Sequence, residues 1–353
     1  MNGKGAAKMA AINMAVVGYG YWGPNIVRNV IERPEFDLWG LCELSAASRD
    51  KFSRRYPGSH ACADFDEALT DPEVEAVAIA TPPNTHHKLV KQALIAGKHV
   101  LVEKPLARTS LEARDLIDTA NTRGTVLMPG HTFLYSPSVR KVRQLIDEDV
   151  LGEMYFVTSS RMNLGKYNQD GVICDLAPHD ISILLHWLEE PVVQVSATAR
   201  SIFQPGVPET AFLTLTFAND AQANIEISWL APRKVRQMVV VGSGRMVQYD
   251  DTSSDEAIRV YDRGMEFSTP ENFGEYQLTY RSGDIVTPRL DPAEPLALEL
   301  SDFAEAIRTG SRPRSHAELG LEVVTAMEAA EESLSRNGEP VAVGGLLPER
   351  IAA

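Results

Sequence analysis

Apolar residues in the first third of the chain occur in short, uninterrupted runs that alternate with amphipathic segments. The runs lack the apolar–polar alternation of a half-exposed strand, as is usual for buried parallel strands. They predict strands at 12–20, 36–44, 74–82 and 99–105, and the amphipathic segments predict helices at 23–32, 84–98 and 111–124. Because strand and helix follow each other in turn, we expect a parallel, doubly wound α/β sheet.

Residues with strong positional preferences mark the starts of these helices. Pro24 falls in the first turn of the first helix, where its missing N–H is not needed. Asn84 or Thr85 can cap the start of the second helix. Thr109 and Glu112 have the spacing of a capping box before the third. These signals agree with the helices that the hydrophobic pattern predicts.

The pattern changes after about residue 130. Residues 212–230 alternate between apolar and polar on either side of a turn at Asn219–Asp220, which predicts an antiparallel hairpin with one buried face. Residues 236–250 predict a second hairpin, and two helical patterns close the chain. We therefore expect two domains, at 1–130 and 131–353, the second an α+β domain with a large, mainly antiparallel open sheet.

Composition narrows the classes of partner and location. The 353 residues carry a formal net charge of −14, which disfavours nucleic acid and anionic membranes because both reward basic surfaces. Cys42, Cys62 and Cys174 are too few and too scattered for a disulfide framework or a zinc site, and suggest free thiols. No signal-peptide pattern and no membrane-spanning apolar run is evident, so we expect a cytoplasmic protein.

Three glycines follow the first predicted strand, in the stretch VVGYGYWGPN. Gly18 permits a tight turn, Gly20 lets the backbone approach a pyrophosphate, and Gly23 lets helix and strand pack closely. The phosphates would lie at the positive end of the following helix. Because the motif lies between a predicted strand and a predicted helix, it predicts that residues 1–130 form an NAD-binding Rossmann domain.

The second predicted strand ends at a carboxylate. Glu43 lies 25 residues after Gly18, close to the interval at which an acid meets the adenosine ribose of a dinucleotide. A carboxylate there accepts hydrogen bonds from the ribose hydroxyls and repels the 2′-phosphate of NADP, so it favours NAD. Arg49 nearby keeps NADP open as the less favoured alternative.

Two further stretches suit proton transfer. Lys104 lies in the EKP stretch at the end of a predicted central strand, the end that faces the ligand crevice in an open α/β sheet. In DLAPHD, Asp175 and His179 are spaced i, i+4 and share one face if the stretch is a helix, with Pro178 in its first turn. A histidine beside a carboxylate can exchange a proton near neutral pH. His186 adds no recognisable third metal ligand, so we expect no metal.

These motifs together resemble the Gfo/Idh/MocA oxidoreductases, nicotinamide-dependent enzymes of sugars, inositols and related polyols. The resemblance rests on the glycine motif and on ATPPNTHH, EKPLA and DLAPHD in the same order, and it covers residues 12–345. It implies that Lys104, Asp175 and His179 form the catalytic group. It also implies a cofactor site that includes Tyr21, Trp22, Thr81, Pro82, Asn84, His86 and Glu103.

The substrate is less constrained. GYWGPN, GHTFLYSP and DLAPHDISILL resemble the branch that oxidises or reduces ring hydroxyls of sugars, often at C3, on a nucleotide-linked sugar or an aminoglycoside. The family's usual arginine is replaced by Leu134, with Tyr135 after it. The candidates for substrate contacts are Tyr135, Arg161, Asn163 and Lys166, with Arg233, Lys234 and Arg236 as further cations.

Several alternatives stay open at this point. The base is His179 or, nearly as well supported, Lys104. The chain could instead be an inositol or free-sugar dehydrogenase, a glycoside-cleaving relative that works through a 3-keto sugar, or a non-catalytic NAD sensor. We also expect a homodimer or homotetramer joined through the second sheet, since Phe212 and Leu230 put apolar surface on its open face.

Overall fold

The computed structural model describes residues 10–165, 168–268 and 277–343, and it divides the chain into two compact units. The first unit comprises 1–132 and 294–324, and the second comprises 133–293 and 325–353. This division differs from the predicted domains, because the segment 294–324 packs with the N-terminal unit rather than with the second. Each unit is built on its own sheet.

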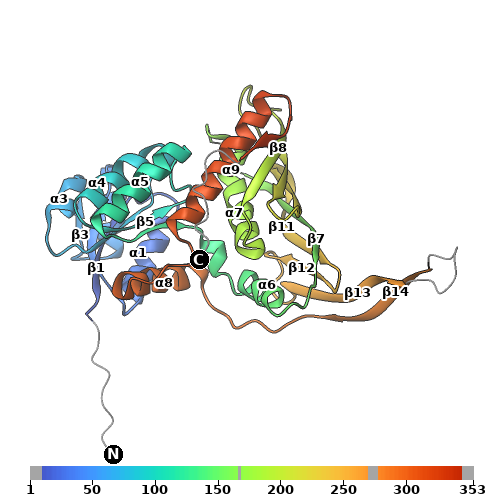
Figure 1. The fold of residues 1–353 in the computed structure, drawn as a ribbon. Helices are drawn as coiled ribbons and strands as arrows, with labels where there is room; N and C mark the ends of the chain where they lie inside the picture. Colours follow the sequence, from blue (N-terminus) through green and yellow to red (C-terminus); the bar gives the residue numbers. More distant parts are fainter. Residues whose placement is uncertain (1–9, 166–167, 269–276, 344–353) are drawn as a thin grey trace, which may run out of the picture. The chain divides into compact units, whose positions relative to one another are not determined.

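The sheet of the first unit is parallel and six-stranded, in the order β3-β2-β1-β4-β5-β6 (Figure 1). The strands are β1 (Ile12–Val17), β2 (Phe36–Cys42), β3 (His60–Cys62), β4 (Ala76–Ile79), β5 (His99–Glu103) and β6 (Leu127–Gly130). Strands β1 and β4 are buried almost throughout, which is why their sequences are apolar without alternation. The order confirms the predicted doubly wound sheet.

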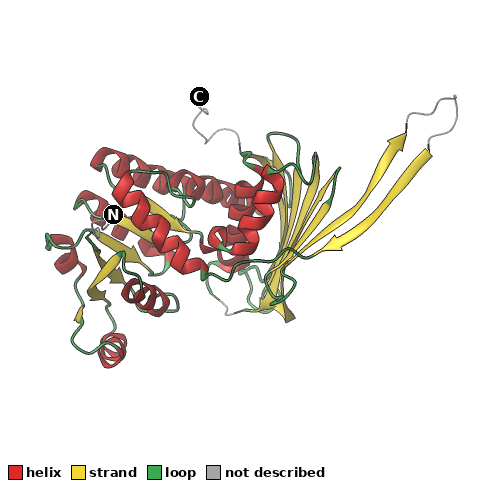
Figure 2. Cartoon of the chain, turned by 90° about the horizontal axis from the view of Figure 1, so that it is seen from below, coloured by secondary structure: helices red, strands yellow, loops and turns green. Residues whose placement is uncertain are grey.

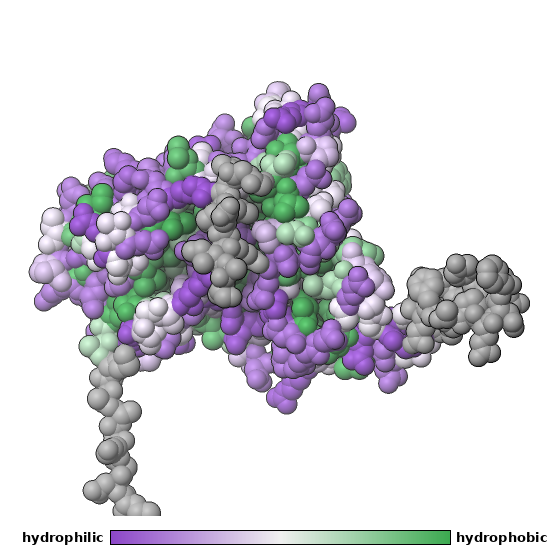
Figure 3. Space-filling model, viewed as in Figure 1, coloured by the Kyte–Doolittle hydropathy of each residue, from purple (hydrophilic) through white to green (hydrophobic). Residues whose placement is uncertain are grey.

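Helices flank this sheet. They are α1 (Gly23–Glu32), α2 (Ala46–Arg55), α3 (Phe65–Thr70), α4 (His86–Ile95), α5 (Ser110–Arg123) and α8 (Pro295–Thr309), with the first residues of α9 (Ala317–Ser335). Helix α8 packs on α1, where Arg28 Nη1 donates to Glu294 Oε2 at 3.1 Å. Hydrophilic side chains cover much of the visible outer face of these helices (Figure 3).

The predicted helix starts are largely confirmed. Pro24 occupies the first turn of α1, and Thr109 Oγ1 caps α5 by accepting from Glu112 N at 3.2 Å. The Glu112 carboxylate accepts a hydrogen bond from Arg108 N at 3.1 Å. In a regular capping box it would accept from the N-cap residue itself, Thr109. Thr85 occupies the predicted N-cap position of α4 but makes no side-chain cap hydrogen bond. A 3-10 turn, Pro83–Thr85, precedes the helix, and Thr85 Oγ1 donates back to Pro82 O.

The second unit contains a nine-stranded sheet in the order β14-β13-β12-β11-β7-β10-β9-β8-β15 (Figure 2). Its strands are β7 (Met154–Leu164), β8 (Val192–Arg200), β9 (Thr210–Phe217), β10 (Gln222–Ser228), β11 (Leu230–Gly242), β12 (Met246–Asp250), β13 (Ile258–Ser268), β14 (Gln277–Val286) and β15 (Val341–Ala342). Both predicted hairpins, β9–β10 and β11–β12, are present and antiparallel. The central pair β7–β10 is parallel.

Helices α6 (Pro137–Asp147) and α7 (Gly171–Leu188) pack against this sheet, and the end of α9 is tied to β8 by Ser333 Oγ accepting from Ala197 N at 2.9 Å. Figure 2 shows the helices of this unit on one face of the sheet. On β9, Leu213 and Leu215 are buried, whereas the side chain of Phe212, on the opposite face, is 51% exposed. Among the described residues, none of the helices is both long and apolar enough to cross a membrane.

Helix α7 differs from its prediction in one respect. It starts at Gly171, so Pro178 lies inside the helix rather than in its first turn. Proline cannot donate to the carbonyl four residues earlier, which here belongs to Cys174. Burial compensates, since α7 is buried along most of its length against the sheet. Asp175 and His179 still share a helical face as predicted.

Candidate active site

The glycine motif forms the turn between β1 and α1, and each glycine has a separate reason to be there. Gly18 has φ +95°, and a Cβ on it would lie 2.6 Å from Ala80 O. A Cβ on Gly23 would collide with the carbonyl oxygen of Gly18. A Cβ on Gly20 would meet nothing within 4 Å, so the backbone there is open to a ligand. This arrangement fits a pyrophosphate at the start of α1.

Glu43 reaches this turn from the end of β2. Its carboxylate accepts hydrogen bonds from Tyr19 N and from Ser45 N, each at 2.7 Å. Arg49 Nη1 donates to Glu43 O at 2.6 Å and to Leu44 O at 2.9 Å. The carboxylate is thereby fixed beside the glycine turn, while the cation at Arg49 is engaged by backbone carbonyls.

Two buried cysteines hold the same edge of the unit. Cys42 and Cys62 are register partners on β2 and β3, with their Sγ atoms 3.4 Å apart. Cys42 O accepts from Gly18 N at 2.9 Å, and Cys62 O accepts from Glu43 N at 3.0 Å. Burial is the main cause that raises the pKa of each thiol above its usual value. Their backbones therefore support both the glycine turn and Glu43.

Tyr21 and Trp22 lie on the turn itself. The side chain of Tyr21 is 78% exposed, and that of Trp22 is partly buried. Their ring centroids are 5.9 Å apart and nearly perpendicular. Two aromatic rings thus flank the residues that the glycine motif assigns to the cofactor.

The ends of β4 and β5 are joined by His86. Its Nδ1 lies 2.8 Å from Pro105 O and its Nε2 lies 2.9 Å from Thr81 O, and the side chain is fully buried. Burial lowers the pKa of His86. The ring therefore holds the loops of Thr81 and Lys104 in place rather than presenting itself to a ligand, whereas Pro82 and Asn84 are exposed.

A buried cluster that the sequence did not indicate lies behind Lys104. Glu299 of α8 accepts a hydrogen bond from Thr132 Oγ1 at 2.7 Å, and His131 is 1% exposed. Burial raises the pKa of Glu103 to about 7, and burial together with the charge of Glu103 raises the pKa of Glu299 well above its usual range. Burial lowers the pKa of His131 to about 3. No sequence signal identifies Glu299, because it lies far along the chain in an ordinary amphipathic helix.

In the second unit, Asp175 and His179 project from α7 one turn apart. Trp229 Nε1 donates to Asp175 Oδ2 at 3.0 Å, which ties this carboxylate to the sheet. The ring of Phe133 meets the His179 ring at 4.9 Å between centroids and 67° between planes. The sequence predicted Asp175 and His179 as site residues but gave no signal for Phe133 and the indole of Trp229, which look like ordinary core residues.

Arg161 is a buried structural cation. Its Nε and Nη2 donate to the carboxylate of Asp180 at 2.8–3.0 Å, and both side chains are almost fully buried, at 3% and 1% exposure. Its guanidinium also lies 4.5 Å from the centroid of Phe133. The sequence treated Arg161 as a substrate contact, yet the structure places it in the packing that surrounds His179.

The other residues predicted to contact the substrate differ in their exposure to solvent. Asn163 is partly exposed on the same strand as Arg161, Tyr135 is 2% exposed, and Lys166 lies outside the described residues. Arg233 and Lys234 are exposed, and Arg236 donates to Asp251 Oδ2 at 2.9 Å. Of this group, Asn163, Arg233, Lys234 and Arg236 have solvent-accessible surface, and the Arg236 side chain is 34% exposed.

Comparison with known proteins agrees with this picture. The family model "Oxidoreductase family, NAD-binding Rossmann fold" matches residues 12–131, and "GFO/IDH/MocA C-terminal domain" matches residues 139–248. The NADP(+)-dependent scyllo-inositol 2-dehydrogenase IolW of Bacillus subtilis is 24% identical, with 94% of this chain and 96% of that protein covered.

Solved structures give the same fold. GenD2 from gentamicin A biosynthesis, in complex with NAD, superposes with a TM-score of 0.80 at 24% identity, covering 97% of this chain and 99% of that one. The UDP-N-acetylglucosamine 3-dehydrogenase GnnA of Acidithiobacillus ferrooxidans has a TM-score of 0.78 at 24% identity, covering 93% and 99%. With both family models matched in order along one chain, this protein belongs to the Gfo/Idh/MocA family of NAD(P)-dependent oxidoreductases.

Proposed function

We propose that the protein is an NAD-dependent dehydrogenase that interconverts a secondary ring hydroxyl of a sugar, at C3, and its ketone. The observation that carries this proposal is the pair Asp175 and His179 on α7, with Asp175 tied to the sheet by Trp229 and His179 packed on Phe133. A carboxylate and an imidazole held one turn apart on a rigid helix suit the proton transfer that accompanies hydride transfer. The Rossmann unit supplies the other half of the reaction.

The roles divide between the units. Bound NAD would supply the acceptor for the hydride of the ring carbon. His179 takes the proton of the same hydroxyl, and Asp175 orients the substrate and stabilises the protonated imidazole. Lys104 donates a hydrogen bond to the reacting oxygen and exchanges roles with His179 if the lysine is the base. Tight positioning of these groups supplies much of the rate.

Glu43 supports NAD as the preferred form of the cofactor. Its carboxylate is fixed at the glycine turn, where it accepts the ribose hydroxyls and repels a 2′-phosphate. Arg49, the residue best placed in sequence to favour NADP, is held by the carbonyls of Glu43 and Leu44. GenD2 was solved with NAD, which is consistent with this assignment.

The substrate class is a nucleotide-linked sugar or an aminoglycoside in a pathway that builds an amino or modified sugar. Both substrate classes are supported by structural similarity: GnnA is named as a UDP-N-acetylglucosamine 3-dehydrogenase, and GenD2 comes from gentamicin A biosynthesis. The net charge of −14 favours the polycationic aminoglycoside through long-range attraction. Exposed Arg233 and Lys234 favour the phosphates of a nucleotide sugar instead.

A substrate panel tests the proposal. NAD reduction is measured with UDP-linked sugars, aminoglycosides and inositols at equal concentration, and the product is identified by mass and NMR. We expect turnover with a UDP-linked sugar or an aminoglycoside. With a substrate that carries deuterium at C3, we expect the deuterium to appear on the nicotinamide. Transfer of label from another carbon would remove the C3 assignment, and no released NADH with any substrate would favour a retained-cofactor relative or an NAD sensor.

A second candidate is an inositol dehydrogenase. It is favoured by the two Bacillus subtilis scyllo-inositol 2-dehydrogenases, one NADP(+)- and one NAD(+)-dependent, that are 24% and 25% identical over almost the whole chain. An inositol also presents a secondary ring hydroxyl, so the same side chains serve. The panel separates the two, because the inositol reading requires turnover of a polyol without a nucleotide or amino group.

A further inference from the structure

A cluster of three different metal-binding side chains lies at the edge of the first sheet, outside the groups assigned to the reaction. His60 and Cys62 are two residues apart on β3 and so point to the same face, and Glu67 follows on α3. One ligand atom from each lies within 4.8 Å of the other two. Sequence spacing alone gave no hint, because no common zinc motif has this interval.

The distances already approach those of a tetrahedral site. Zinc binds nitrogen and oxygen at about 2.0–2.2 Å and sulfur at about 2.3 Å, so two ligand atoms lie roughly 3.3–3.8 Å apart. His60 Nε2 and Glu67 Oε2 are 3.5 Å apart. Their side chains are 44% and 51% exposed and can rotate, whereas Cys62 is 6% exposed and fixed in the strand. A small rotation of the two outer ligands onto the inner one closes the site.

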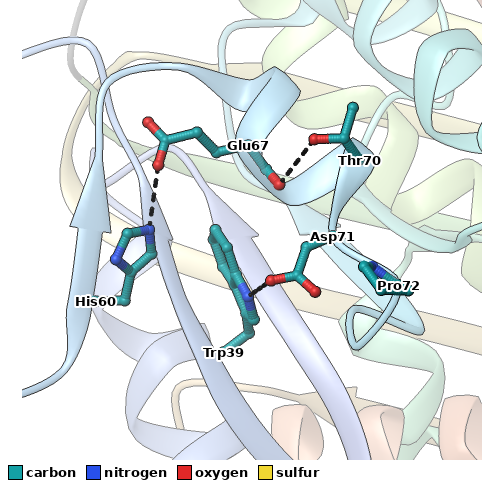
Figure 4. Close-up of a pocket in the computed structure, with 6 residues that line it drawn as sticks. All are labelled: Trp39, His60, Glu67, Thr70, Asp71 and Pro72. Carbon is teal, nitrogen blue, oxygen red and sulfur yellow. Dashed lines mark hydrogen bonds and ion pairs between the residues drawn. The ribbon is translucent and has the colours of Figure 1, made fainter.

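One of the two outer ligands, His60, packs against a neighbouring indole. The indole of Trp39 meets the His60 ring at 4.5 Å and 73°, and its Nε1 donates to Asp71 Oδ2 at 2.8 Å. Figure 4 shows the His60 ring and the Glu67 carboxylate pointing toward each other beside this indole. These residues line an open pocket of about 590 Å³, which leaves room for a water as fourth ligand.

We propose that His60, Cys62 and Glu67 bind one divalent zinc-like cation, with a water in the fourth position. Mixed nitrogen, sulfur and carboxylate ligands select zinc over magnesium or calcium, which prefer oxygen alone. On binding, the Cys62 S–H bond breaks, the sulfur bonds to the metal, and the proton passes to solvent. No oxidant or reductant takes part.

The site has a direct connection to the cofactor turn. Cys62 O accepts the hydrogen bond of Glu43 N at 3.0 Å, so the residue that binds the cation also positions the carboxylate assigned to the ribose. Asp64, two residues after Cys62, caps α3 by accepting from Asp66 N at 3.0 Å and fixes the path from Cys62 to Glu67. A cation here would join β3 and α3 at the adenosine end of the unit.

Titration of the full chain with Co²⁺, under a phosphine reductant that keeps all thiols reduced, tests the proposal. We expect one Co²⁺ per chain, a thiolate-to-cobalt charge-transfer band, release of one proton, and displacement by Zn²⁺. His60→Ala and Glu67→Gln should weaken binding by at least about tenfold, since even supporting groups of metal sites cost that much. Cys62→Ser should abolish the charge-transfer band.

Matched variants guard against two errors. Cys174→Ser, in the second unit, should bind Co²⁺ as the wild type does, and Cys42→Ser tests whether the neighbouring thiol, 3.4 Å from Cys62, is the real ligand. A cooperative thermal unfolding transition close to that of the wild type shows that each variant has folded. The proposal is overturned if no thiolate band forms, if Cys62→Ser keeps it, or if Cys42→Ser removes it.

Discussion

At the scale of single residues, Glu43 combines a structural role at the glycine turn with the role assigned to it in cofactor binding. It accepts from Tyr19 N and Ser45 N, and it is assigned to the ribose. Glu43→Ala should weaken NAD binding by about 1–3 kcal/mol, the value of a hydrogen bond to a charged group. It should also reduce the preference for NAD over NADP, because the carboxylate no longer repels the 2′-phosphate of NADP. Fluorescence titration with both cofactors measures this.

The matched control is Arg49→Ala. Its guanidinium is engaged by the carbonyls of Glu43 and Leu44, so its loss should change affinity for both cofactors alike. If the wild type prefers NADP, or if Arg49→Ala alone abolishes NADP binding, the role given to Glu43 is wrong.

Lys104 and His179 are assigned to one proton transfer. Each alanine variant should lower kcat by roughly 10²–10⁴, as for loss of a general acid or base, with little change in NAD affinity for His179→Ala. Groups that act together lose activity non-additively, so the double variant should be little slower than either single one. Stopped-flow measurement of the hydride step checks this, and near-normal turnover in His179→Ala would assign the base to Lys104.

Glu299 makes stability depend on pH in a direction opposite to that of an ordinary ion pair. Its pKa is raised in the folded chain, so the folded state keeps a proton that the unfolded state releases as the pH rises. Stability is therefore lost with rising pH above the unfolded pKa. Glu299→Gln, which can still accept from Thr132, should gain stability over the wild type progressively as the pH rises above the unfolded pKa, and the gain is followed between about pH 5 and about pH 8.

Urea unfolding across this pH range measures the gain. Glu305→Gln, at an exposed position of the same helix, is the control and should not reproduce it. A gain of equal size at both ends of the range would mean that Glu299 acts through packing rather than through its proton.

At the scale of elements, the buried pair Arg161–Asp180 joins β7 to α7 and lies against Phe133, which packs on His179. Asp180→Ala leaves a buried guanidinium without its counter-charge and should cost about 3–5 kcal/mol of unfolding free energy. Glu332→Ala, which breaks the exposed Arg336–Glu332 pair, should cost about 0.5 kcal/mol or less. Denaturant midpoints measure both, and equal costs would contradict the structural role.

The elements also show what the sequence could and could not predict. Local signals located β1, α1, α5 and the hairpins β9–β10 and β11–β12, because period, caps and turn residues act over a few positions. They failed at Pro178, where burial of α7 outweighs the missing hydrogen bond, and at Thr85, whose hydroxyl prefers Pro82 O.

The same limit applies to the site. The sequence predicts roles for Gly18, Glu43, Asp175 and His179 because each belongs to a local pattern. Their supports come from distant parts of the chain and carry no local signature: Trp229 for Asp175, and Glu299 beside Thr132. The sequence did not predict the pairing of Arg161 with Asp180, because a cation on a strand looks the same in sequence whether it faces a ligand or a buried carboxylate.

At the scale of the whole molecule, the open face of the nine-stranded sheet predicts association. Phe212 is 51% exposed on it and Phe156 is 43% exposed. Apolar side chains on an uncovered sheet face favour pairing between copies with closed symmetry. We expect light scattering to give two or four times the chain mass of 38.8 kDa, and Phe212→Glu to raise the dissociation constant. A wild-type mass near 38.8 kDa at micromolar concentration would refute this.

The discontinuity of the first unit bears on how the protein is made. Helix α8 packs on α1 but follows it by more than 250 positions, so the nascent Rossmann unit lacks this helix until Thr309 has left the ribosome. At roughly 5–20 residues per second, the wait between residues 132 and 324 is on the order of 10–40 s. During that time the surface of α1 that later meets α8 is uncovered. The packing of the first unit is therefore completed only after strands β7 to β14 of the second sheet have been synthesised.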